Sequence, residues 1–281
     1  MCIKPKKRCR CKRSLLICIA VFLLVFGVSA IIFPIIVQEN ELNIAAVEYT
    51  ELAEQHQPEP SLAGFEVEML VPVPSPDDIA EPAKPPSSGG SSYSGINFNA
   101  LRETNKDCIA WIKIPGTKIN YPVVLSNDTD YYLTHTFSGK ESKIGTLFSL
   151  AKTDYAAPGK NIAVYGHNIS GSGQNMFHPL TSYKRESFYL GHQAIQFDTL
   201  YRSATFKIFA VINMDKSEWD PSTATFANDG AFLAFIERAK SQSLYDTGIE
   251  VNTSDHVLTL ITCDRNYLPM DGRLVIMAVM E

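Results

Sequence analysis

Residues 257–263 read Val257-Leu-Thr-Leu-Ile-Thr-Cys263, a run of apolar and β-branched side chains that ends on a thiol. Such a short run, followed by polar residues, is typical of a buried strand. A polar loop over 264–272 comes next, and Arg273 then leads into a second run of the same kind, 274–279. If the two runs pair as antiparallel strands across the loop, Arg273 returns beside Cys263.

Six further runs of strand-forming residues precede this pair, so the sequence predicts eight strands. They cover 109–114, 119–125, 144–150, 161–165, 194–197 and 205–213, with 257–262 and 274–279 as the last two. Helical patterns are few: an amphipathic one over 230–242, a shorter one over 176–183, and a short helix capped by Asn97. Many short strands without regular strand–helix alternation favour a mainly β (α+β) fold with an antiparallel or mixed eight-stranded barrel.

The N-terminus has the pattern of a membrane anchor. Ser14 to Val37 holds 24 residues without a charged side chain, enough to cross a bilayer as a helix. Residues 1–13 carry seven basic and no acidic side chains, so the positive-inside rule predicts a single-pass protein of the cell membrane with its N-terminus in the cytoplasm. The alternative is a cleaved signal peptide, since Val28-Ser-Ala30 resembles a cleavage site. Either way, the rest of the chain is exported.

Composition divides the chain into four predicted parts. Residues 1–13 form a basic cytoplasmic tail and 14–37 the transmembrane segment. Residues 38–57 are polar and acidic, as in a stalk helix, and 58–92 are rich in Pro, Gly and Ser, as in a spacer, so 38–95 reads as stalk and linker. The catalytic domain is expected over 96–281.

Charge and cysteine usage exclude several classes of protein. After the seven basic residues of the tail, 18 basic residues remain against 30 acidic ones, so the exported part has a formal charge of −12. Such a surface argues against nucleic acid as a partner. Only Cys108 and Cys263 lie outside the tail and the span, which excludes a disulfide scaffold but leaves a single Cys108–Cys263 disulfide as an alternative. No phosphate-binding loop, dinucleotide fingerprint or zinc-protease motif is present, and we expect neither cofactor nor metal.

The residue types that can do chemistry gather around the two last strands. A lone thiol at a strand end is more often a small buried hydrophobe. Beside Cys263, however, the Arg273 guanidinium can stabilise a thiolate and donate hydrogen bonds to an oxyanion. His167 follows the strand 161–165 and can exchange a proton with a thiol at the same barrel rim. The remaining histidines are expected at surface or satisfied core positions; they are His56, His135, His178, His192 and His256.

These motifs resemble those of a known family. The order Tyr165-Gly-His-Asn168, then Thr259-Leu-Ile-Thr-Cys263, then Arg273 resembles sortases, the thiol transpeptidases that attach proteins to Gram-positive cell walls. Trp111-Ile-Lys-Ile-Pro-Gly-Thr117 and the inserted helix over 230–242 are similar to class B sortases. The resemblance implies a closed eight-stranded sortase-type barrel.

The resemblance also implies roles for individual residues. Cys263, His167 and Arg273 would be catalytic, and we expect Tyr165, Thr262 and Asp264 beside them to bind substrate. Some class B members have a Ser two residues before the Cys and an acid two residues after it, where this chain has Ile261 and Arg265. A Cys-His-Arg arrangement is therefore the prediction, rather than a Cys-His-Asp triad.

The function implied is cleavage of a C-terminal sorting motif in exported proteins. Cys263 would form a thioacyl intermediate at a Thr carbonyl, and an amine of a cell-wall peptide precursor would accept the acyl group. Two alternatives remain open: a pilus-type sortase whose acceptor is a Lys amine of another subunit, and a membrane-tethered binding ectodomain without turnover.

Overall fold

The structure is a computed structural model that describes residues 10–57, 95–170, 175–264 and 271–281; side chains are described from residue 27 onward and at Phe22. Most of the predicted basic tail, the Pro/Gly/Ser-rich spacer and Arg265 lie outside the described residues. The boundaries proposed between tail, span, linker and catalytic domain stay predictions.

Eight strands close into a barrel, as predicted. They are β1 (Cys108–Lys113), β2 (Asn120–Ser126), β3 (Leu147–Leu150), β4 (Asn161–Tyr165), β7 (Ala194–Thr199), β8 (Ser203–Asp215), β9 (Val257–Cys263) and β10 (Gly272–Met280). Their order around the barrel is β1-β2-β3-β4-β9-β10-β8-β7. The pairs β2–β3 and β4–β9 are parallel, and the other described pairs are antiparallel, so the sheet is mixed. Two short strands, β5 (Asn168–Ile169) and β6 (Asn175–Met176), were not predicted because two residues carry no periodicity.

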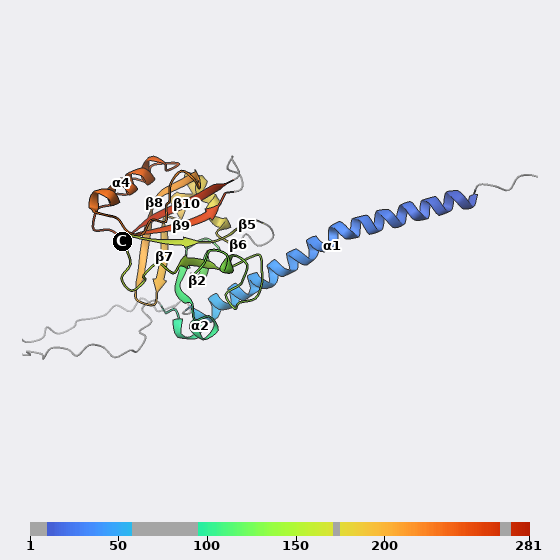
Figure 1. The fold of residues 1–281 in the computed structure, drawn as a ribbon, viewed down its shortest axis with the longest axis horizontal. Helices are drawn as coiled ribbons and strands as arrows, with labels where there is room; N and C mark the ends of the chain where they lie inside the picture. Colours follow the sequence, from blue (N-terminus) through green and yellow to red (C-terminus); the bar gives the residue numbers. More distant parts are fainter. Residues whose placement is uncertain (1–9, 58–94, 171–174, 265–270) are drawn as a thin grey trace, which may run out of the picture.

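Strand alternation gives β9 an inner and an outer face. Leu258 and Leu260 belong to the larger core cluster, which includes the barrel interior. Val257 and Ile261 belong to a second cluster with the apolar side chains of α4 (Asp229–Ser241), which covers this outer side (Figure 1). Because side chains alternate along a strand, Cys263 lies on the outer face, two residues beyond Ile261. The helix predicted over 230–242 is thus confirmed.

The remaining helices are short, apart from α1 (Arg10–His56). The Asn97 side chain accepts a hydrogen bond from the Ala100 amide and caps α2 (Phe98–Thr104). Three further turns of helix lie in the connections: η1 (Tyr131–Leu133), η2 (His178–Lys184) and α3 (Glu186–Gly191). The helix predicted over 176–183 is present as the 3₁₀ helix η2.

The C-terminal part of α1 packs against the barrel, which a free stalk would not do. Its buried residues Ala45, Tyr49 and Leu52 join the larger core cluster at helical spacing. The Tyr49 hydroxyl donates to the Gly145 carbonyl (2.6 Å) and accepts from the Phe137 amide (3.1 Å). The N-terminal part of α1 extends away from the barrel as a single rod (Figure 1). Its described apolar side chains are exposed and include Phe22, Ile31, Ile32, Phe33, Ile35 and Ile36.

Candidate active site

Cys263 and Arg273 are paired at the end of the β9–β10 pair where the connecting segment leaves β9 and enters β10. Arg273 is the register partner of Cys263. The Asp264 amide donates to the Gly272 carbonyl at 2.9 Å, so Cys263 and Arg273 form a non-hydrogen-bonded pair, the type in which opposite side chains come closest. The Cys263 thiol is exposed, and Arg273 is half-buried, with its guanidinium donating to the Gly272 carbonyl at 3.0 Å. The predicted return of Arg273 beside Cys263 is found.

His167 reaches the same end of the barrel from β4. Tyr165 of β4 pairs in parallel with Ile261 of β9. His167 follows Tyr165 by two positions, and Cys263 follows Ile261 by two positions. The Gly166 amide donates to the Ile261 carbonyl (3.2 Å), which extends the ladder toward His167. Since β9 lies between β4 and β10, continuing the β4–β9 register by two residues places His167 on one side of Cys263, with Arg273 on the other.

The His167 ring is hydrogen-bonded to a backbone carbonyl. His167 Nε2 lies 2.8 Å from the Leu133 carbonyl at the end of η1. A carbonyl oxygen can only accept, so Nε2 carries a hydrogen and Nδ1 is the nitrogen that can gain or lose a proton. Gly145 packs beside this contact with φ +65°, and a Cβ there would lie 3.0 Å from the Leu133 oxygen and 3.2 Å from His167 Cδ2.

Two of the three predicted substrate-binding side chains are turned into the protein. Thr262 is 2% exposed, and its hydroxyl donates to the Gly166 carbonyl at 2.8 Å. Asp264 is also 2% exposed and forms an ion pair with Lys184 of η2. Thr262 and Asp264 therefore stabilise the backbone next to His167 and Cys263 through internal contacts.

Tyr165 is the third predicted substrate-binding residue, and it is half-buried on the outer face. Its ring stacks on Phe148 with centroids 5.4 Å apart. Burial raises the pKa of its phenol, which keeps the hydroxyl protonated and able to donate. Thr262 and Asp264 are buried, so Tyr165 is the one of the three whose side chain is partly exposed to solvent.

Sequence reasoning missed a pair of polar residues that touch the site. The Asn168 amide donates from Nδ2 to the Cys263 carbonyl at 2.8 Å, and its Oδ1 lies 2.6 Å from His178 Nδ1. Asn168 closes the motif Tyr165-Gly-His-Asn168, but the sequence assigns it no role of its own. His178 was expected at an unremarkable surface or core position.

Cys108, the other cysteine of the barrel, has none of these features. Cys108 opens β1, is fully buried, and burial raises the pKa of its thiol to about 12. Both Cys108 and Cys263 are free thiols, so the disulfide considered as an alternative is not formed.

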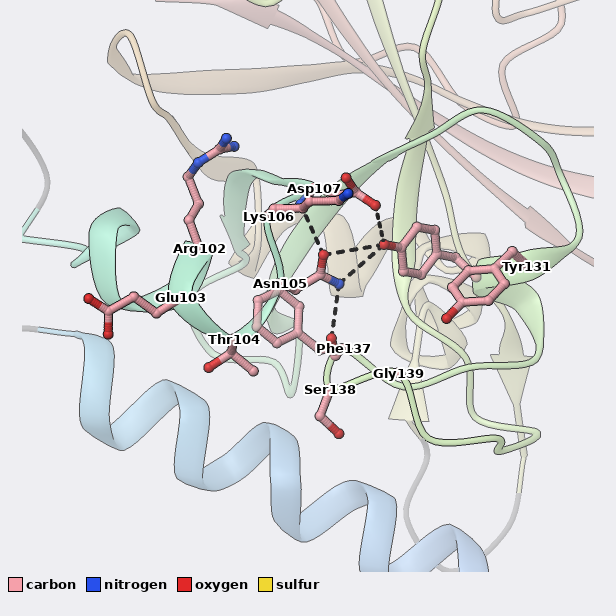
Figure 2. Close-up of a pocket in the computed structure, with 11 residues that line it drawn as sticks. Arg102, Glu103, Thr104, Asn105, Lys106, Asp107, Tyr131, Phe137, Ser138 and Gly139 are labelled. Carbon is pink, nitrogen blue, oxygen red and sulfur yellow. Dashed lines mark hydrogen bonds between the residues drawn. The ribbon is translucent and has the colours of Figure 1, made fainter.

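A separate polar cavity of about 460 Å³ lies between α2 and the segment 131–139 (Figure 2). Figure 2 shows Asn105 among the residues that line it, and the Asn105 amide donates to the Phe137 carbonyl at 2.9 Å. The cavity is lined by none of the six predicted site residues. Tyr131 and Tyr132 of η1 line the cavity, and Leu133, the last residue of η1, supplies the carbonyl that contacts His167.

Comparison with known proteins gives one consistent family. Residues 112–281 match the family described as Sortase domain. Sortase B of Staphylococcus aureus is 30% identical over 182 residues, which is 64% of this chain and 73% of that protein.

Solved structures agree with this match. The Staphylococcus aureus sortase B–substrate complex has a TM-score of 0.61 at 28% identity, covering 66% of this chain and 84% of that one. Sortase B of Clostridium perfringens has a TM-score of 0.61 at 30% identity, covering 66% of this chain and all of that one.

Proposed function

Since this chain belongs to the sortase family of cysteine transpeptidases and is most similar to class B, we propose that it cleaves a C-terminal sorting motif of exported proteins with Cys263 as the nucleophile. The observation that carries this proposal is the row of His167, Cys263 and Arg273 at the ends of three neighbouring strands. A related sortase B has been solved as a substrate complex, which supports a peptide substrate here.

In the acylation step, the Cys263 thiolate attacks the carbonyl carbon of the Thr that precedes the scissile bond. A C–S bond forms, the C–N bond breaks, and the His167 imidazolium gives its Nδ1 proton to the leaving amine. The Leu133 carbonyl stabilises the imidazolium by accepting from Nε2, which also fixes the ring orientation. The products are a thioester on Cys263, a neutral His167 and the released C-terminal fragment.

In the transfer step, an acceptor amine replaces sulfur on the same carbonyl carbon. Neutral His167 takes a proton from the amine as the C–N bond forms and the C–S bond breaks. This returns the Cys263 thiolate and the His167 imidazolium, so no external acid or base is consumed. For the acceptor we propose an amine of a cell-wall peptide precursor.

Arg273 stabilises the negative oxygen that develops in both steps. Its guanidinium belongs to the residue that is paired with Cys263 in the strand register. The Asp264 amide, an obvious backbone candidate for this role, already donates to the Gly272 carbonyl. The Asp264 carboxylate is paired with Lys184. These contacts favour a Cys-His-Arg arrangement over a Cys-His-Asp triad.

We further propose that α1 anchors the enzyme in the cell membrane with the barrel outside. Among the described residues, α1 is a helix long and apolar enough to cross a bilayer. The seven basic residues among positions 1–13, ahead of the apolar stretch that begins at Ser14, favour a cytoplasmic N-terminus. Because the same helix packs into the barrel through Ala45, Tyr49 and Leu52, the barrel is held close to the membrane surface.

The test uses the full chain in detergent micelles with a peptide library in which Thr precedes the scissile bond, plus a primary amine. We expect amine-dependent ligation that is abolished, by at least about 10³-fold, in Cys263→Ala. Cys108→Ala is the matched control because this thiol is buried, and it should retain activity. Ligation that survives the loss of Cys263 would sink the proposal.

A further inference from the structure

The parallel ladder between β4 and β9 stops at the point where the site begins. Its last backbone bond runs from the Gly166 amide to the Ile261 carbonyl. In a parallel pair, the next bond in this direction would run from the amide of residue 168 to the Cys263 carbonyl. The chain instead turns away: the His167 carbonyl accepts from the Phe177 amide (2.8 Å), and Asn168 enters the β5–β6 hairpin.

The Asn168 side chain takes the place of that missing bond. Its Nδ2 donates to the Cys263 carbonyl at 2.8 Å, and the residue is 8% exposed. This single contact ties the residue after His167 to the backbone of Cys263, across 95 positions of sequence.

His178 of η2 fixes the direction of the amide. Its Nδ1 lies 2.6 Å from Asn168 Oδ1, and since this oxygen can only accept, Nδ1 carries the hydrogen. The amide nitrogen is thereby left for Cys263. If the Asn168 amide were flipped, its Oδ1 would face the Cys263 carbonyl oxygen and its Nδ2 would face the N–H of His178. Both hydrogen bonds would then be lost.

We propose that Asn168, oriented by His178, is a positioning residue that keeps the Cys263 end of β9 in register with His167. The proposal rests on the proposed function and deepens it. Without this bond, the β4 side holds β9 only up to Thr262, through the Gly166 contacts of Ile261 and Thr262, and the Cys263 backbone can shift relative to His167. Misplacement of reacting groups by about 1 Å can cost about 10²-fold in rate.

The competing explanation is an ordinary buried hydrogen bond that contributes only to stability. Asn161 provides the matched control, because it is a buried Asn (1% exposed) on β4 itself, at the end away from His167. Its Nδ2 donates to the Pro221 (2.9 Å) and Thr223 (3.1 Å) carbonyls, and its Oδ1 accepts from Thr259 (2.7 Å).

The first experiment measures kcat, KM and the thermal midpoint of the full chain in micelles for Asn168→Ala, Asn168→Asp and Asn161→Ala. We expect kcat to fall about 10- to 100-fold in both Asn168 variants with KM within about 2-fold. Asp keeps the shape but, when ionised, loses the donor. Asn161→Ala should lower the midpoint at least as much and keep kcat within about 2-fold. Unchanged kcat in Asn168→Ala, or an equal loss in Asn161→Ala, overturns the inference while leaving the proposed function intact.

The second experiment does not require turnover. NMR titration of His167 is compared with and without Cys263→Ala, first in the wild-type chain and then in Asn168→Ala. Two titrating groups held close together influence each other's midpoints. We expect removal of the thiol to shift the His167 midpoint in the wild-type background and to shift it less in Asn168→Ala. Equal shifts in both backgrounds, or none in either, contradict the inference even if no peptide substrate is found.

Discussion

Arg273 of β10 lies directly opposite Cys263 of β9 in a non-hydrogen-bonded antiparallel pair. In such a pair the two side chains emerge on the same face and closer together than in a hydrogen-bonded pair. A one-residue slip of either strand would send one of them to the opposite face. The β9–β10 register therefore determines whether a cation stands beside the thiol.

The contact between Gly145 and His167 predicts a loss of activity in Gly145→Ala. Its Cβ would lie 2.7 Å from the Tyr132 carbonyl oxygen and 3.2 Å from His167 Cδ2. We expect kcat to fall at least about 10-fold because the ring and its carbonyl partner must move. Gly139→Ala is the control: Gly139 also has positive φ (+82°), but the atom nearest to an added Cβ is the Tyr131 hydroxyl oxygen at 3.7 Å. Gly139→Ala should lose about 1–2 kcal/mol of stability from its backbone conformation alone, and Gly145→Ala should lose more because its Cβ also meets two backbone oxygens. Equal kcat values in the two variants would refute the prediction.

The hydroxyl of Tyr49 should stabilise the attachment of α1 to the barrel. Tyr49→Phe leaves the Gly145 carbonyl and the Phe137 amide without this partner in a buried place. We expect the free energy of unfolding to fall by about 1–3 kcal/mol in urea titrations. Tyr201→Phe, at a 55% exposed position, should change it by less than about 0.5 kcal/mol. A similar change in both variants would mean that the α1 contact contributes little.

The ion pair between Lys184 and Asp264 should matter more than a surface pair. Lys184→Met removes the cation from a carboxylate that is 2% exposed, and we expect a loss of about 2 kcal/mol in the free energy of unfolding. Lys216→Met breaks a pair with Asp271 in which both side chains are more than half exposed. That variant should lose at most about 1 kcal/mol. The idea fails if the two losses, measured by urea unfolding, are the same.

His178 predicts a pH dependence of stability. Burial lowers the pKa of His178 below its usual value, so the unfolded chain binds a proton that the folded chain resists. The folded state should therefore lose stability as the pH falls through about 6.5, down to the lowered pKa. His178→Gln should flatten this slope in unfolding titrations between pH 7.5 and 5.5. An unchanged slope would show that other groups cause it.

Much of the barrel could be predicted because its strands carry local signals. The run 257–263 and its continuation after Arg273 fix two strands, their loop and the Cys–Arg pair. His167 was found because it follows a clear strand. The positions of Asn168 and Lys184 relative to Cys263 and Asp264 depend on contacts 95 and 80 residues apart, which no local pattern encodes.

The packing of α1 was missed for a related reason. Its C-terminal part is acidic with spaced Leu and Ala, a pattern shared by a solvated stalk and by a helix that buries one narrow stripe. The partner of Tyr49 is the segment around Gly145, 96 positions away. The surface that buries this stripe exists only once the barrel has folded, so the sequence pattern alone does not distinguish a packed helix from a solvated stalk.

The role of Cys263 as nucleophile is tested most directly by the intact mass of the full chain, quenched with acid during turnover of a sorting-motif peptide without added amine. We expect a mass increase equal to the acyl fragment ending in Thr, mapped to Cys263, removed by hydroxylamine and missing in Cys263→Ala. Peptide cleavage without an adduct at Cys263, or an adduct that persists in Cys263→Ala, would contradict it.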